Sequence, residues 1–243
     1  MTHKTKGIVL RSIKYGETSL VVTIFTELFG LQAYMINGAR LSKKTGTRAA
    51  MFQPAAILEL EVYHNEQKQV QRIKESNWSV IYDHVLSDVI KNNIALYMVE
   101  LLHKALKQPE KNHELFYFCE DILTQLDTAG NTIAANLPLF FTLHLADFFG
   151  FRISSPLKEE PGYLDLKEGA FTNEQPGHPH FLHSEYALLT AELLNTRIPS
   201  ELGELHLNKK IRRELLLKYQ EYYALHIHDF GQMKTLKVLH EIL

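Results

Sequence analysis

The chain has 243 residues, 45% hydrophobic and 22% charged, an ordinary composition for a globular protein. No apolar run approaches the roughly 20 residues that a membrane helix needs, so the composition excludes a membrane span. The single cysteine, Cys119, excludes an intramolecular disulfide and a thiolate cluster. Because the first residues also lack a signal-peptide core, we expect a reducing, cytoplasmic setting.

The net charge of −2 hides an uneven distribution. Residues 1–77 contain 11 Lys and Arg against 6 Asp and Glu, a net charge of +5, whereas residues 78–243 contain 15 against 22, a net charge of −7. Such an asymmetry indicates that one part of the chain meets a polyanion and the other does not.

Five short segments of the first third are predicted to be strands, because apolar and polar residues alternate with period two. They lie at residues 8–13, 20–24, 31–36, 58–63 and 70–74. In the last segment Ile73 is out of step, which suggests a bulge. Five short strands are too few for a large sandwich and suit a small closed barrel. We therefore predict a barrel domain at residues 1–77.

A Gly-, Ser- and Thr-rich segment at residues 38–48 carries four cations between two predicted strands. Lys and Arg on a loop can follow phosphates by Coulomb attraction and counterion release, without reading bases. The candidate nucleic-acid-binding residues are Arg11, Lys14, Tyr15, Tyr34, Arg40, Lys43, Lys44 and Arg48. The alternative for the lysines is a solvated loop, and the alternative for the two tyrosines is packing rather than base stacking.

From about residue 78 the apolar period changes to that of helices, which predicts an all-α domain at 78–243. Helices with an apolar stripe are expected near residues 90–101 and 115–126, and further helices near 137–149, 184–195, 208–230 and the C-terminus. Asn136 is the predicted N-cap of the third helix and Gly150 its C′ residue. Ser184 and Asn208 are the predicted caps of two later helices.

Residues 154–183 interrupt this helical pattern with four prolines. The two runs at 163–166 and 170–171, around Glu168-Gly169, predict a small hairpin. We interpret the segment as an irregular excursion within the helical domain.

Thirteen histidines raise the possibility of a metal site, with the densest group at His178, His180 and His183. Structural zinc usually recruits cysteines, which this segment lacks, and Pro179 splits the group. Surface or helix-capping roles are the alternative, and we predict no metal and no cofactor. We find no catalytic constellation, and Cys119 is expected to pack in its apolar stripe.

Four cations begin a late helix, an unfavourable place for the helix dipole unless an outside anion compensates. They are Lys209, Lys210, Arg212 and Arg213. We predict a partner-binding role for them, and the alternative is a solvated helix face.

Short motifs follow one another along the chain in a fixed order. They are KGIVLR at 6–11, YGETSL at 15–20, FTELFG at 25–30, NGAR at 37–40, QP at 53–54, FFGF at 148–151 and the closing segment 223–239. Together they resemble the bacterial RecO recombination-mediator family over essentially the whole chain.

The resemblance implies an α+β protein, with a five-stranded OB-fold barrel followed by a larger helical domain. It implies a non-enzymatic role in RecF-pathway repair at the nucleoid: binding single- and double-stranded DNA, annealing strands and helping to load RecA. The implied partners are a RecR-like protein and the C-terminal tail of single-stranded DNA-binding protein. Many members carry a four-cysteine zinc module where this chain has its excursion at 154–183, without those cysteines. Two alternatives stay open, an RNA-binding OB protein and a histidine-based metal hydrolase.

Overall fold

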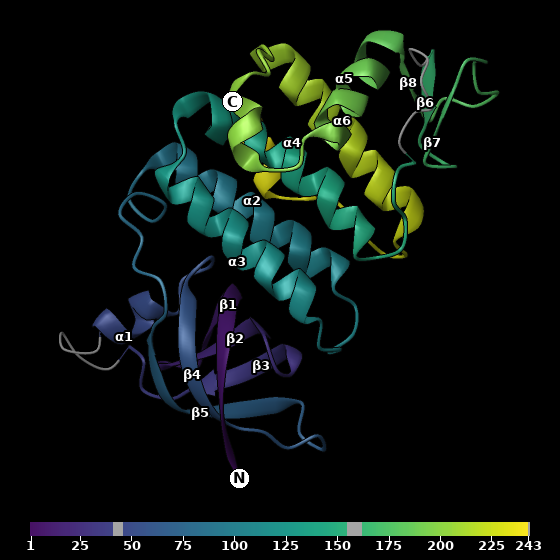
Figure 1. The fold of residues 1–243 in the computed structure, drawn as a ribbon. Helices are drawn as coiled ribbons and strands as arrows, with labels where there is room; N and C mark the ends of the chain where they lie inside the picture. Colours follow the sequence, from purple (N-terminus) through teal and green to yellow (C-terminus); the bar gives the residue numbers. More distant parts are fainter. Residues whose placement is uncertain (41–45, 155–161, 243) are drawn as a thin grey trace. The chain divides into compact units, whose positions relative to one another are not determined.

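The computed structural model describes residues 1–40, 46–154 and 162–242, and for residues 46–48 the backbone alone. The chain forms two compact units, which are described separately (Figure 1). One unit comprises Met1–Ser87 and Leu102–Asp127, and the other comprises Asp88–Leu101 and Thr128–Leu243. The units are therefore not consecutive stretches of sequence.

The first unit is built around a closed barrel with the strand order β1-β2-β3-β5-β4 (Figure 1). The strands are β1 (Thr2–Tyr15), β2 (Ser19–Thr26), β3 (Gly30–Ile36), β4 (Ile57–Tyr63) and β5 (Val70–Trp78). Neighbouring strands are antiparallel except β3 and β5, whose parallel pairing closes the barrel. The α+β fold with a five-stranded N-terminal barrel is confirmed.

Two irregularities bend the strands. The register between β4 and β5 shifts so that Glu61 pairs with Glu75 but Val62 pairs with Ile73, which leaves Lys74 as the extra residue of a bulge. The bulge expected from the position of Ile73 is thus confirmed. A second shift in β1, at Leu10, was not predicted.

The barrel interior is an apolar core to which every strand except β5 contributes fully buried side chains. Val22, Tyr34 and Val62 are among these residues, each with no exposed surface. The helix α1 (Gly46–Met51), between β3 and β4, was predicted as part of a loop, and its Met51 packs against the core. Because Tyr34 is enclosed, its ring offers no face to a nucleic-acid base, so the stacking role proposed from the sequence is wrong and the packing alternative holds.

The helix α3 (His113–Thr128) belongs to the barrel unit as far as Asp127. Phe116 on α3 packs against Phe25 of β2 with ring centroids 5.7 Å apart, and Lys6 donates to Glu120 over 2.8 Å. Asp127 accepts hydrogen bonds from the backbone N–H groups of residues 83, 84 and 85 at 2.8–2.9 Å. Burial alone would raise the pKa of Asp127, but these three hydrogen bonds lower it below its usual value.

The second unit is mainly helical. Its helices are α4 (Asn131–Asp147), α5 (Ser184–Asn195), α6 (Lys209–His226), α7 (Thr235–Ile242) and the first part of α2 (Val89–Ala105), with a 3-10 turn at Pro199–Gly203. The predicted cap Asn208 is confirmed, since its side chain accepts from the N–H of Ile211. His183, not Ser184, is the N-cap of α5. Of the described helices, none is both long and apolar enough to cross a bilayer.

The start of α4 corrects the sequence prediction. Its N-cap is Gly130, and Asn136 lies inside the helix, fully buried, where its amide donates to the carbonyls of Leu202 and Leu205. Pro138 is inside the helix and not in its first turn. Gly150, just beyond the end of the helix, has the positive φ of +80° expected for a helix-terminating glycine.

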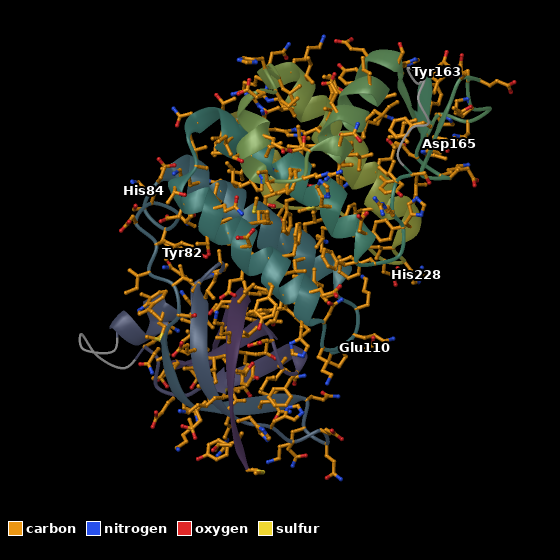
Figure 2. All side chains as sticks on the ribbon, viewed as in Figure 1. Tyr82, His84, Glu110, Tyr163, Asp165 and His228 are labelled. Atoms are coloured by element: carbon orange, nitrogen blue, oxygen red, sulfur yellow. The ribbon has the colours of Figure 1, made fainter. Side chains whose placement is uncertain are left out.

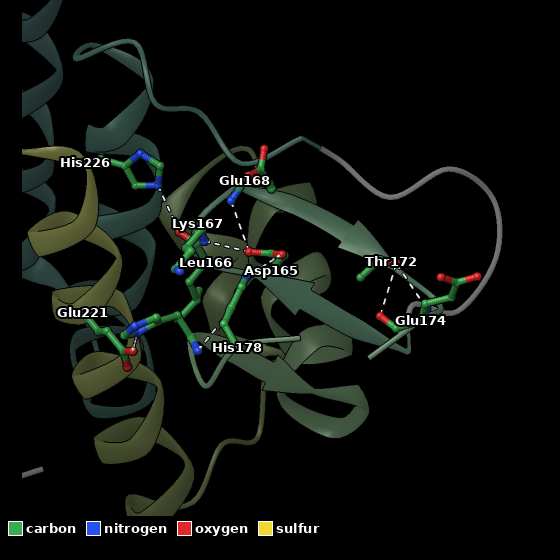
Figure 3. Close-up of polar contacts among 10 residues, drawn as sticks. Asp165, Leu166, Lys167, Glu168, Thr172, Glu174, His178, Glu221 and His226 are labelled. Carbon is green, nitrogen blue, oxygen red and sulfur yellow. Dashed lines mark hydrogen bonds and ion pairs between the residues drawn. The ribbon is translucent and has the colours of Figure 1, made fainter. Parts of the chain in front are cut away.

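The proline-rich excursion contains a three-stranded sheet of order β7-β6-β8. The predicted hairpin is confirmed by β6 (Tyr163–Asp165) and β7 (Ala170–Thr172), and β8 (Phe181–His183) adds an unpredicted third strand. Polar contacts fasten this sheet to α6, as Figure 3 shows. His180 Nδ1 lies 2.5 Å from Glu221 Oε1, and His226 Nε2 donates to the carbonyl of Leu166 over 3.0 Å.

Candidate nucleic-acid interface

The exposed outer surface of the barrel is set by alternation along β1. Val9 points into the core, and beyond the bulge Arg11, Ile13 and Tyr15 share the outer face. Arg11 is exposed, and Tyr15 and Ile13 are 60% and 44% exposed. The cation of Arg11 lies two residues before Ile13, and the accessible ring of Tyr15 lies two residues after it. This arrangement is suited to phosphate contact and base stacking.

Cross-strand pairing extends this surface over three more strands. Arg11 lies opposite Thr23 of β2, which lies opposite Ala33 of β3. One row along, Met35 of β3 lies beside Arg72 of β5, which is exposed. We call the surface formed by Arg11, Tyr15, Thr23, Ala33 and Arg72 the basic face. Three strand spacings separate its two cations, about 14 Å along the sheet.

The end of the barrel next to the basic face carries two further exposed cations. Lys14 pairs with Leu20 at the end of the β1–β2 hairpin. Arg40 is exposed, and its backbone N–H donates to the carbonyl of Thr18 in that hairpin turn over 3.0 Å. The structure therefore brings the predicted residues Arg11, Lys14, Tyr15 and Arg40 to one end of the barrel.

The side chains of three predicted DNA-binding residues are not described by the structure. Lys43 and Lys44 lie outside the described residues. Arg48 is within α1, and its side chain is not described. Their contact with nucleic acid stays a prediction.

Two barrel cations, unlike those of the basic face, are neutralised by nearby carboxylates. Lys6 is ion-paired with Glu120 at 2.8 Å, and Lys74 with Glu61 at 2.9 Å. Within the described part of the chain, Arg11, Lys14, Arg40 and Arg72 form no ion pair. Their charge remains available for an outside anion, since a phosphate meets no competing internal carboxylate.

The cations at the start of α6 are partly engaged within the second unit. Lys209 donates to the carbonyls of Glu241 and Ile242 at the end of α7, over 3.0 and 3.4 Å. Arg212 donates to the carbonyl of Leu207, and partial burial lowers the pKa of its guanidinium. Arg213 is half-buried and Lys210 exposed. The four residues therefore do not form one uniform exposed face.

The histidines of the excursion contact carboxylates on neighbouring elements. His178 Nε2 lies 3.2 Å from Asp165 Oδ2, and His180 meets Glu221. Burial alone would raise the pKa of Glu221, but hydrogen bonds from Lys218 and His180 lower it below its usual value. Among the residues the structure describes, no three His, Cys, Asp or Glu side chains converge in a way that could hold a metal ion.

The residues of the excursion also do not fit the four-cysteine zinc module that many members of the resembled family carry at this place. The chain's one cysteine, Cys119, lies on α3 in the barrel unit, and burial raises the pKa of its thiol. The excursion holds its small sheet by backbone pairing and histidine contacts.

Sequence reasoning missed Arg72. It lies on the weakest predicted strand, and its place beside Met35 depends on a parallel pairing of β3 with β5 that no local pattern reveals. The one available signal was the five-strand count, because closing a barrel requires the last strand to meet an earlier one.

The closed five-stranded barrel is that of the oligonucleotide-binding barrel class, and its cations without ion pairs in the described chain and its exposed tyrosine are groups suited to nucleic-acid binding. Comparison with known proteins narrows the class. Residues 1–82 match the family described as "Recombination protein O N terminal", and residues 86–155 match "Recombination protein O C terminal".

Whole relatives match as well. The chain is 34% identical over 245 residues to the DNA repair protein RecO of Flavobacterium psychrophilum and 32% identical over 249 residues to that of Flavobacterium johnsoniae. It is 30% identical over 243 residues to the DNA repair protein RecO of Azobacteroides pseudotrichonymphae. Each match covers 100% of this chain and 99% of the relative. The chain therefore belongs to the RecO family of DNA repair proteins, recombination mediators that are generally non-enzymatic.

Proposed function

We propose that the protein binds single- and double-stranded DNA through the basic face and the adjoining barrel end, and anneals complementary strands without nucleotide hydrolysis. The observation that carries this proposal is the group of exposed barrel cations, including Arg11 and Arg72, without carboxylate partners in the described chain. Phosphate contacts of this kind screen the repulsion between two strands and leave base edges free to pair.

An annealing assay with complementary labelled oligonucleotides tests this function. The double variant Arg11→Ala/Arg40→Ala should anneal more slowly and bind both DNA forms more weakly than the wild type. Lys74→Ala, which removes an equal charge already paired with Glu61, is the matched control for each substitution. Competition with RNA of the same sequence distinguishes a general single-strand binder from an RNA-specific one, because only RNA offers a 2′-OH.

We further propose that the protein helps to load RecA on strands coated by single-stranded DNA-binding protein, with a RecR-like partner. Recruitment would use the acidic C-terminal tail of the coating protein. A pocket of about 580 Å³ in the second unit suits such a peptide, since Ile90, Ala134 and Leu207 give it apolar walls and Arg212 gives it a cation. This pocket includes one of the four cations predicted from the sequence.

Helix ends add to the attraction of this pocket for an anion. The first turns of α2, α4 and α6 line it, and in these described helices none of the three first turns contains an acidic residue. Gly130 gives α4 no side-chain cap, so the first N–H groups of that helix lack that partner. Each helix N-terminus carries partial positive charge. Asp88 also lines the pocket, and its carboxylate accepts a hydrogen bond from the backbone N–H of Lys91.

A fluorescent peptide with an acidic stretch and a terminal aromatic residue tests recruitment by the whole protein. Arg212→Gln and the pocket-filling variant Ala135→Phe should weaken binding, whereas Lys237→Ala, an exposed cation of α7, should not. Equal binding by all four proteins would show that the tail docks elsewhere. Added salt should weaken the wild-type interaction, because the peptide is acidic.

A further inference from the structure

A second pocket, of about 660 Å³, opens on the outer side of the barrel. Thr23 and Ala33 line it, and these are the residues that follow Arg11 across β2 and β3 in the basic face. The pocket is therefore continuous with the proposed DNA-binding surface. A strand whose phosphate meets Arg11 and then crosses toward β5 passes over this pocket.

Two loops form the other walls of the pocket. The β4–β5 loop contributes His64 and Lys68, and the connection between α2 and α3 contributes Pro109 and Lys111. Neither lysine forms an ion pair within the described chain. The pocket thus has a cation on each of two loops, together with one carboxylate, that of Glu66.

The wall formed by the α2–α3 connection is packed tightly against the barrel. At Gly30, which has a φ of +63°, an added Cβ would lie 2.3 Å from the carbonyl oxygen of Glu110. Figure 2 labels Glu110 on this connection. The backbones of the β2–β3 turn and the connection thus lie too close together for a side chain to fit between them at this point.

The chemistry of the lining matches a nucleobase better than a phosphate. The rings of Phe29 and His64 stack with centroids 4.0 Å apart and planes 13° from parallel, and both residues line the pocket. The side-chain amides of Gln67 and Gln69 add hydrogen-bonding groups. Flat apolar rings with amides recognise the faces and edges of unstacked bases, whereas Glu66 would repel a phosphate placed deep in the pocket.

A base can enter such a pocket only when it is unpaired. In a duplex the bases are stacked inside and must be extruded at a cost, whereas a single strand presents them freely. We propose that the pocket accepts one unpaired base of a strand lying along the basic face, and that the protein thereby prefers single-stranded to duplex DNA. This inference rests on the proposed DNA-binding function and adds the element that distinguishes the two DNA forms.

Two variants that fill the pocket test the proposal on the full-length protein. Gln67→Phe and Gln69→Phe each place a ring at the pocket edge from the exposed β4–β5 loop, outside both the basic face and the core, and their melting temperatures check folding independently. The probes are an oligothymidylate of about 12 nucleotides, an abasic strand and a duplex of the same length. Arg11→Ala reports on the phosphate contacts alone.

The filled variants should bind oligothymidylate roughly tenfold more weakly, the contribution of about one stacked base. Their binding of duplex and abasic strands should stay unchanged, while Arg11→Ala should weaken all three probes. If Arg11→Ala weakens all probes but the filled variants lose nothing, or lose oligothymidylate and duplex equally, the pocket takes no base and this inference fails. If Arg11→Ala changes none of the probes, the proposed DNA-binding surface is wrong and the inference fails with it.

Discussion

The salt dependence of DNA binding should separate the cations of the basic face from the other barrel cations. Arg11 and Arg72 are exposed and without ion pairs in the described chain, so each can replace a condensed counterion on the DNA. For single strands, each phosphate contact contributes about 0.7 to the slope of log K against log salt. Removing both arginines should therefore make this slope shallower by about 1.4.

That change has a direct experimental measure. A fourfold rise in salt should narrow the affinity gap between wild type and Arg11→Ala/Arg72→Ala by about sevenfold. Fluorescence anisotropy with a labelled oligonucleotide of about 12 nucleotides, at several salt concentrations, gives the slope for each protein. Lys74→Ala should leave the slope unchanged, because Glu61 already neutralises Lys74 at 2.9 Å.

Two results would refute the reasoning. An unchanged slope for the double variant would mean that neither arginine meets a phosphate. An equal loss for Lys74→Ala as for each arginine would mean that binding follows net charge and not a defined surface. The same assay with Lys43→Ala/Lys44→Ala tests the basic segment at 38–48. We expect this double variant also to have a slope of log K against log salt that is shallower than the wild-type slope by about 1.4, alike for all DNA sequences.

Further predictions concern stability. Asp127→Ala should lower the free energy of unfolding by about 3 kcal/mol in urea titrations, because three backbone N–H groups lose their acceptor. Since the folded-state pKa of Asp127 is lowered, its contribution to the free energy of unfolding should be present above about pH 4 and lost as pH falls further. The Asp127→Ala variant should lack this component of acid sensitivity. Gly30→Ala should lower the free energy of unfolding more than Gly16→Ala. Both glycines have a positive φ, which costs an alanine about 1–2 kcal/mol, but only at Gly30 would the added Cβ also meet the Glu110 carbonyl. A chelator should leave the melting temperature unchanged, and a fall reversed by zinc would contradict the metal-free reading.

The strands of the barrel could be predicted because each has one face in the core. On β4, Leu58, Leu60 and Val62 are buried in strict alternation, and the period-two pattern reports that directly. The same rule could have corrected the error at Tyr34, which shares a strand face with the buried Ile36 two residues on. Arg72 was beyond local reasoning, because its neighbours are set by a pairing between distant segments.

The error at α4 has a different physical cause. Pro138 resembles a first-turn proline, and Asn136 just before it resembles a cap. In the fold, the Asn136 amide instead satisfies two carbonyls about 66–69 residues away, Leu202 and Leu205, which no sequence window contains. The exposure of Arg11, Lys14 and Tyr15 was easier to predict, because exposed strand ends and turns follow from the strand pattern itself, and their contact with DNA stays a prediction.

The placement of α3 within the barrel unit bears on how the protein is made. Ribosomes deliver the chain from its N-terminus, and the last barrel strand ends at Trp78, whereas the unit is complete only at Asp127. At about 5–20 residues per second, the 49 residues between them take roughly 2–10 s to synthesise. For most of that interval Phe25 lacks its later partner, Phe116. Nascent chains stalled between these two points should be the aggregation-prone products, a hazard of translation that the finished protein no longer shows.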